Sequence, residues 1–182
     1  MPRLPEVLDR DALPEDKRQI YDYLAGTRGA VRLPFSAYLN NPELTYRIAH
    51  VGSFIRFEGS VPDATRELAI LATAREMDAR YEWAGHSRLA RELGVSDATV
   101  DAIANRTAPA GLSPEEALPV RVAQGLLRDH ALSDELFKEA HAKFGNAGVV
   151  ELLGTVGYYA LMACIINGLQ IEPAPDAPQL PM

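Results

Sequence analysis

Three residues near the middle of the chain, Glu67, Glu82 and His86, have the side chains that proton-transfer chemistry needs. Glu82 and His86 are four residues apart, so on a helix their side chains share one face. Glu67 opens a nearly all-apolar run, and on a helix its face also carries Ile70 and Leu71. A buried carboxylate facing a carboxylate–imidazole pair can move protons. These three are therefore the candidate catalytic residues.

Each of them also has an ordinary structural interpretation. Glu67 could be a first-turn acid that complements the positive helix N-terminus while its head stays in water. Glu82 and His86 could form a surface pair that contributes about 0.2–0.5 kcal/mol. Spacing alone does not separate these alternatives. The three side chains could also supply metal ligands, but no His-Glu-x-x-His motif or cysteine pair supports this, so no metal site is predicted.

Three predicted helices surround the candidate residues. The helix that carries Glu67 follows Pro62 and runs to about residue 78, and the helix that carries Glu82 and His86 covers 79–93. Gly94 is a typical C-terminal stop for the latter. Before them, Asn41-Pro42-Glu43 starts a helix over 42–58, with Asn as N-cap and Pro in the first position. Its stripe of Tyr46, His50, Ser53 and Phe57 could line a pocket, although a core histidine is the alternative for His50.

The remaining pattern is helical as well. Residues 1–14 are predicted to be an extended arm, 29–40 a loop and 172–182 a proline-rich tail. Gly26 is predicted to end the first helix. A further helix opens with a capping box at Ser113, and Pro119 is predicted either to kink it or to delay its true start. No segment alternates with the two-residue period of a strand. The fold class is therefore all-α, with roughly seven or eight helices in a single domain, residues 1–182. The further helices are predicted at 14–25, 96–104, 113–129, 133–144 and 146–169.

Composition narrows the possible partners. The chain has 182 residues, 47% of them hydrophobic and 24% charged, which suits a globular protein. A formal charge of −7 argues against nucleic acid or an anionic membrane surface as a partner. The apolar region 149–169 contains Glu151 and Asn167, so a core helix is favoured over a membrane span. No signal peptide is recognised at the N-terminus, and a single cysteine, Cys164, fits a cytoplasmic location and is expected to be buried and inert.

Three motifs resemble one known family. They are Arg66-Glu67-Leu68-Ala69-Ile70-Leu71, Tyr81-Glu82-Trp83-Ala84-Gly85-His86 and Ala90-Arg91-Glu92-Leu93-Gly94-Val95-Ser96. Together they are similar to the carboxymuconolactone decarboxylase family, which is related in fold to AhpD-type alkylhydroperoxidases. The resemblance covers about residues 45–105. It implies an all-helical subunit of AhpD-like fold, assembled into homotrimers or homohexamers, with its site where the helix of Glu67 meets the helix of His86.

One departure from the AhpD-like pattern separates the two branches of this superfamily. The resemblance places that branch's Cys-x-x-Cys positions at Ala79 and Glu82. Dithiol peroxidase chemistry needs one thiolate to attack the peroxide and a second thiol to resolve the sulfenic acid, and neither residue can serve. The chain instead resembles the decarboxylase-like branch, whose chemistry is acid–base.

The resemblance therefore implies a cofactor-free enzyme that acts on a small carboxylated or lactone-type substrate. In this hypothesis His86 is the general acid/base, Glu82 exchanges a proton beside it, and Glu67 orients His86 and tunes its pKa. Two alternatives stay open. One is a thiol peroxidase that uses Cys164, and the other is a catalytically silent, oligomeric binding protein.

Further residues are candidates for contacting a substrate. Tyr46, His50, Arg80 and Tyr81 form this set, and Arg66 and Arg75 could also hold a substrate carboxylate. For the arginines the alternative is a solvated ion pair with Glu76 or Asp78. For the tail, 172–182, two predictions stand side by side: a segment lying across a neighbouring subunit, or a frayed terminus.

Overall fold

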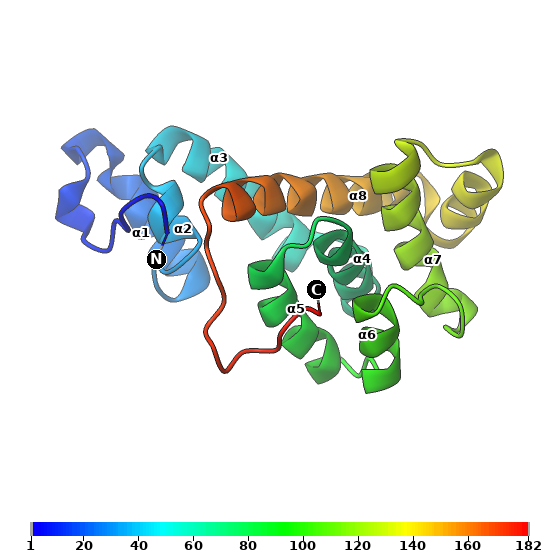
Figure 1. Ribbon diagram of the computed structural model, residues 1–182. Coiled ribbons are helices and arrows are strands. Elements are labelled where there is room, and N and C mark those ends of the chain that lie inside the picture. The colour runs from blue at the N-terminus through cyan, green and yellow to red at the C-terminus, as the bar shows by residue number, and fades with distance from the viewer. Residues whose placement is uncertain (1, 182) are drawn as a thin grey trace. The chain divides into compact units, whose positions relative to one another are not determined.

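The computed structural model describes residues 2–181, and within them it contains eight α-helices and no strand (Figure 1). The prediction of an all-α chain is confirmed. Short 3₁₀ segments lie at Arg10–Ala12 and Glu15–Lys17, and π-helical segments at Phe54–Glu58 and Gly125–Asp129. The α-helices are α1 (Arg18–Arg28), α2 (Phe35–Tyr38), α3 (Pro42–Ser53), α4 (Asp63–Glu76), α5 (Arg80–Glu92), α6 (Asp97–Ala104), α7 (Pro114–Gln124) and α8 (Asp134–Gly168).

The chain divides into two compact units. The first unit contains residues 2–59 and 166–172, and its core is built around Ile20, Leu24 and Leu39. The second unit contains residues 60–165 and 173–181 and has the larger core. All three candidate catalytic residues belong to the second unit. That the whole chain is one functional domain stays a prediction.

Helix α4 is the central element of the second unit. Its residues from Arg66 to Arg75 are all buried, because α5, α6 and α7 pack around it (Figure 1). A helix enclosed by neighbours needs apolar side chains on every face, which explains its continuous run of Leu, Ile and Ala. Any polar side chain in this run is therefore carried into the interior, and Glu67 is one of them.

The start of α4 is fixed by a carboxylate from α8. Glu151 accepts hydrogen bonds from the backbone N–H groups of Ser60 and Val61, both at 2.8 Å, and from the Ser60 hydroxyl at 3.0 Å. Burial works to raise the pKa of Glu151, but these hydrogen bonds outweigh it and hold that pKa below its usual value.

Replacing Glu151 should consequently destabilise the protein. We expect Glu151→Ala to lower the free energy of unfolding by about 1–3 kcal/mol, because two backbone N–H groups, that of Val61 partly buried, lose a charged acceptor. Urea unfolding measures the change. The matched control is Glu115→Ala, which removes a carboxylate paired with Lys143 at the exposed surface and should lower the free energy of unfolding much less. Equal losses in the two variants would contradict the structural role of Glu151.

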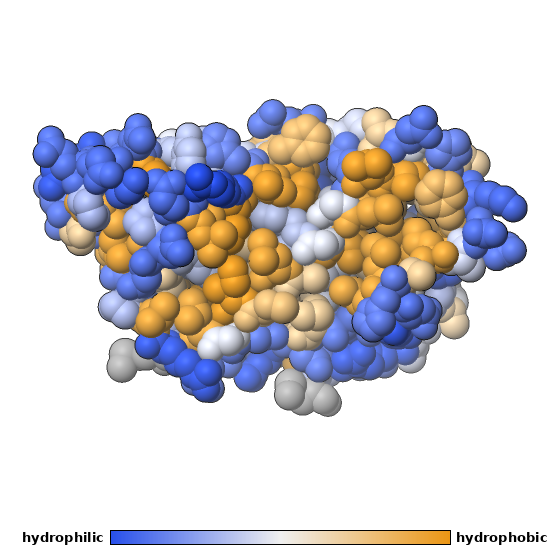
Figure 2. Space-filling view, turned by 90° about the horizontal axis from the view of Figure 1, so that it is seen from above, coloured by the Kyte–Doolittle hydropathy of each residue, from blue (hydrophilic) through white to orange (hydrophobic). Residues whose placement is uncertain are grey.

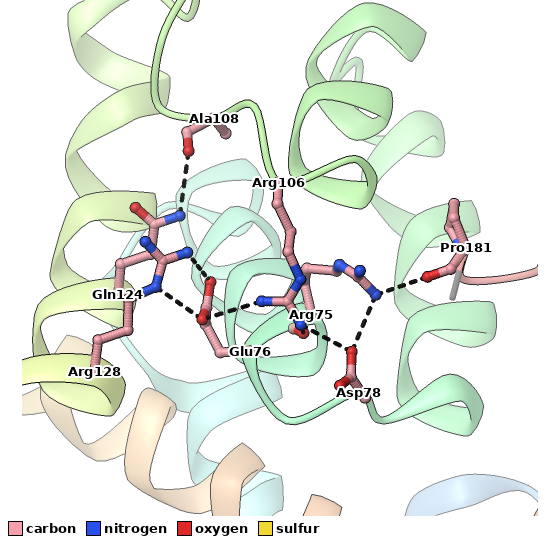
Figure 3. A network of polar contacts seen from close by, with 8 residues as sticks. All are labelled: Arg75, Glu76, Asp78, Arg106, Ala108, Gln124, Arg128 and Pro181. Carbon is pink, nitrogen blue, oxygen red and sulfur yellow. Dashed lines mark hydrogen bonds and ion pairs between the residues drawn. The ribbon is translucent and has the colours of Figure 1, made fainter.

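A polar network fixes the turn between α4 and α5 (Figure 3). Arg106, which follows α6, donates to Asp78 and to the carbonyl oxygen of Arg75, while Arg128 forms two hydrogen bonds with Glu76. Asp78 itself adopts a left-handed conformation, with φ of 46°. The network therefore sets the path by which the chain leaves the helix of Glu67 and enters the helix of His86.

The same network holds the C-terminal tail. Arg75 donates to the carbonyl oxygen of Pro181 at 2.8 Å, and the side chain of Leu180 lies in the core of the second unit (Figure 3). The prediction of a frayed terminus is therefore wrong up to residue 181. Its proline content excludes a helix, but it does not prevent an extended segment from packing through Leu180.

Two details of the predicted elements are wrong, and one is confirmed. Helix α1 continues through Gly26, because a single interior glycine costs a helix only about 1 kcal/mol. The helix ends at Gly29, whose φ of 75° suits a glycine. The segment predicted as a loop contains α2. The predicted break between 133–144 and 146–169 is confirmed, because Gly145 (φ 65°, ψ −174°) interrupts the helical conformation inside α8.

Helix α8 is long and apolar enough, by length and composition, to cross a membrane. Half of its most apolar window is nevertheless buried within the protein. Leu152, Val156 and Ala163 contribute to the core of the second unit. These features are typical of a core helix in a small, soluble-type helical fold, as the sequence predicted.

Candidate active site

The side chain of His86 lies between two carboxylates. Its Nδ1 is 2.6 Å from Glu67 Oε2, and its Nε2 is 3.3 Å from Glu82 Oε2. Glu67 comes from α4, whereas Glu82 lies one turn before His86 on α5. Both ring nitrogens thus face an acceptor, and the contact to Glu67 is much the shorter. The structure brings together the three candidate catalytic residues.

The three side chains are shielded from solvent to different degrees. Glu67 is completely buried, while the side chains of Glu82 and His86 expose 8% and 11%. The interpretation of Glu67 as an acid with its head in water is therefore wrong, and so is that of Glu82 and His86 as a surface pair. The small exposed fraction of the site belongs to Glu82 and His86.

Electrostatics favour a charged imidazole in this position. Burial by itself lowers the pKa of His86, but the hydrogen bonds and charges of Glu67 and Glu82 outweigh it and raise that pKa to about 9. At neutral pH both ring nitrogens accordingly carry protons, and each N–H donates to a carboxylate. His86 is thus a proton donor held in a fixed orientation.

Two further residues complete the surroundings. The ring of Tyr159 on α8 meets the imidazole of His86 edge to face, with centroids 4.9 Å apart. On the opposite side of Glu67, Arg66 Nε lies 3.7 Å from Glu67 Oε1. The sequence predicted neither the contact of Tyr159 with His86 nor that of Arg66 with Glu67. Tyr159 lies in an apolar run 73 positions after His86, where no local signal could identify it.

A family model supports the assignment of this segment. The model of the carboxymuconolactone decarboxylase family matches residues 42–125, which include α4 and α5 with all three site residues. This segment is similar to the carboxymuconolactone decarboxylase family. A search of curated protein sequences finds no match.

Solved structures give the fold beyond that segment. The alkylhydroperoxidase AhpD core of an uncharacterized peroxidase-related protein from Ralstonia eutropha JMP134 is similar with a TM-score of 0.77 and 19% identity, over 96% of this chain and 93% of that one. An uncharacterized peroxidase-related protein from Silicibacter sp. TM1040 gives 0.75 and 15%, over 96% and 95%. The debrominase Bmp8, a cysteine-to-alanine variant in complex with 2,3,4-tribromopyrrole, gives 0.68 and 14%, over 93% and 91%. At these identities the comparisons establish an AhpD-like fold.

The candidate substrate-binding residues lie in different parts of the chain. Tyr46 and His50 belong to the first unit, where His50 stacks on Tyr23 at 4.2 Å and meets Tyr46 edge to face at 4.4 Å. His50 is exposed, so the alternative of a core histidine is wrong. Arg80 and Tyr81 lie in the first turn of α5, exposed and half-buried respectively. A role for these four residues in binding stays a prediction.

Three other expectations need correction. Cys164 is exposed on α8, because the apolar run around it presents one face of the helix to solvent. Arg66 and Arg75 are buried rather than solvated, and Arg66 pairs with Asp63 rather than with Glu76 or Asp78. Arg75 does pair with Asp78, as one alternative predicted.

Within residues 2–181 no group of three or more His, Cys, Asp or Glu side chains has the geometry of a metal site.

Proposed function

We propose that this protein is a cofactor-free acid–base enzyme that resembles 4-carboxymuconolactone decarboxylase. It acts on a small carboxylated or lactone-type molecule by proton transfer and decarboxylation. One observation carries the proposal: the imidazole of His86 is buried between two carboxylates and has a pKa raised to about 9. Such a group donates a proton at neutral pH and regains it from a neighbour.

The chemistry of a lactone carboxylate matches this arrangement. Loss of CO₂ from a γ-lactone carboxylate, assisted by a proton shift, leaves the bonding electrons in an enolate-like intermediate. The catalyst then has to stabilise that negative charge and deliver a proton to carbon. A protonated imidazole fixed next to the substrate does both, because its charge opposes the developing anion and its N–H supplies the proton.

The two carboxylates have different tasks in this proposal. Glu67, at 2.6 Å from Nδ1 and fully buried, orients the ring and keeps it protonated. Glu82, at 3.3 Å from Nε2 and closer to solvent, is the partner that a substrate can displace. Nε2 is therefore the atom that delivers the proton, and Glu82 returns one to it after each turnover.

The test is an assay of CO₂ release from a panel of carboxylated γ-lactones. We expect turnover by the parent protein with solvent-derived hydrogen at the carbon that loses CO₂, which deuterium incorporation in D₂O detects. Absence of CO₂ release across the panel would contradict the decarboxylase proposal. CO₂ release without solvent deuterium at that carbon would contradict the role of His86 as the proton donor.

A thiol peroxidase is the second candidate, and the exposure of Cys164 is the observation that favours it. It is weaker, because Ala79 and Glu82 occupy the positions of the two redox cysteines and this sequence holds one cysteine in all. Titration of the thiol in the folded protein before and after a peroxide challenge separates the two functions. A thiol count that peroxide leaves unchanged excludes the peroxidase. A silent binding protein would release no CO₂ and leave the thiol intact.

We also propose a cytoplasmic homotrimer or homohexamer. What supports assembly is the uncharged face of α8, along which apolar and small side chains gather at the surface (Figure 2). Val150 and Leu161 on this face are 71% and 44% exposed, and a contiguous exposed apolar surface is typical of an interaction site. Light scattering at the mass of a monomer would contradict this proposal. The exposed residues of the face are Ala147, Val150, Gly154, Gly157, Leu161 and Cys164.

A further inference from the structure

Arg66 lies behind the candidate site, on the side of Glu67 away from His86. Its Nε is 3.7 Å from Glu67 Oε1, and its NH1 donates to Asp63 Oδ1 at 2.8 Å. The side chain exposes 7%, so it is in effect part of the interior. We propose that Arg66 is a positioning residue that balances the charge of the Glu67–His86–Glu82 group and does not bind substrate.

The first argument is the lack of other partners. Glu67 Oε1 and Arg66 Nε are both buried, and neither has a hydrogen-bond partner within the protein. Each therefore finds its compensation in the opposite charge beside it. A carboxylate oxygen in the interior without any such charge would be strongly unfavourable. Since arginine stays protonated in proteins, its compensation is permanent.

The second argument is the sum of the charges. Four buried charged groups lie together here: Glu67 and Arg66 from α4, and Glu82 and the protonated His86 from α5. Two further carboxylates act on Arg66 from outside this group: Asp63, which is 63% exposed and therefore screened by solvent, and Glu151 from α8. Within the group of four, two negative and two positive charges cancel. Without the guanidinium, the buried group would keep a net charge of −1. A net charge of zero is favoured in the protein interior, where solvent cannot screen the charges.

The third argument concerns the position of the Glu67 carboxylate. Arg66 attracts Oε1, which leaves Oε2 directed at His86 Nδ1. At its other end the guanidinium is tied to Asp63, whose side chain is 63% exposed and tolerates substitution. The guanidinium thus holds Glu67 in register with the imidazole. It also limits how strongly the two carboxylates retain the proton of His86.

NMR titration of ¹⁵N-histidine-labelled protein tests this role directly. In Arg66→Gln we expect the midpoint of His86 deprotonation to rise by about one pH unit or more, because a nearby positive charge is lost. Arg66→Lys, which keeps the charge, should return the midpoint to within a few tenths of the parent value. Arg75→Gln is the matched control, since Arg75 is also a buried arginine of α4 in an i,i+3 pair with an aspartate, and it should leave the midpoint unchanged.

A second variant keeps the test decisive if Arg66→Gln does not fold. Asp63→Asn removes an exposed charge and frees the guanidinium to act on Glu67, so the midpoint of His86 should fall by a few tenths of a pH unit. Unchanged midpoints in Arg66→Gln, or in Asp63→Asn where the former is unfolded, would overturn the assignment. An equal rise in Arg75→Gln would also overturn it.

The catalytic part of this inference rests on the proposed function, but the titration does not need turnover. If the midpoints shift as expected while no lactone is decarboxylated, the assignment of Arg66 stands and the proposed function fails. If lactones are decarboxylated and the midpoints do not move, the proposed function stands and the assignment of Arg66 fails. With both in place, the pH profile of kcat in Arg66→Gln should shift in the same direction as the midpoint.

Discussion

Replacing His86 with alanine is expected to lower the turnover of a carboxylated lactone by at least about 100-fold, the usual contribution of a positioned general acid or base. The reason is geometric as well as chemical. The imidazole is the group that both carboxylates contact, through Nδ1 and Nε2, so its removal takes away the proton donor and leaves Glu67 and Glu82 without their shared partner. Rates of CO₂ release under saturating substrate measure the effect.

Two comparisons make the result interpretable. The control is His141→Ala, which removes an exposed histidine bonded to Asn146 and should leave turnover within about twofold of the parent. Circular dichroism should show that both variants remain helical. Parent-like turnover in a folded His86→Ala protein would reject the mechanism, whatever the substrate.

Much of the fold could be predicted because local rules act within single helices. Asn41 accepts from the backbone N–H of Leu44, and Ser113 forms its capping box with Glu116, as the sequence indicated. The run from Leu68 to Ala72 is apolar on every face of the helix, which already indicated an enclosed helix. Such signals involve residues at most four positions apart. These local signals therefore do not depend on how the helices pack against one another.

The features that could not be predicted depend on contacts between distant residues. Leu180 anchors the tail through the core, and Arg75 reaches the carbonyl oxygen of Pro181 over 106 positions. The exposure of Cys164 depends on which face of α8 its neighbours cover. A thiol in an apolar run gives no local sign of that choice, so its predicted burial was wrong.

The candidate site shows the same division. The four-residue spacing of Glu82 and His86 placed them on one face, and the helix fold made them neighbours. The approach of Glu67 spans 19 positions and depends on how α4 packs against α5, so it came from the family resemblance rather than from spacing. Arg66 was visible next to Glu67, but only the structure shows it buried and directed away from solvent.

The stability of the protein should fall as the pH rises through the range in which His86 loses its proton. The pKa of His86 is about 9 in the folded protein and 6.5 in an unfolded chain, because the carboxylates of Glu67 and Glu82 overcome the effect of burial. Between these values the folded state binds one proton more than the unfolded state. The free energy of unfolding therefore decreases with pH in this range, and the contribution of His86 is fully present only below about pH 6.5.

The expected size of the effect follows from the shift. A rise from 6.5 to about 9 corresponds to about 3 kcal/mol of stabilisation that is lost as the pH passes through 9. Urea unfolding at a series of pH values, compared between the parent and His86→Gln, isolates this contribution, because other titrating groups are common to both proteins. The control is His141→Gln, which removes an exposed histidine bonded to Asn146 and should preserve the slope of the parent. If the parent and His86→Gln lose stability in parallel from pH 6.5 to 9, the imidazole is not held in the charged form, and the proton donor of the proposed mechanism is lost with it.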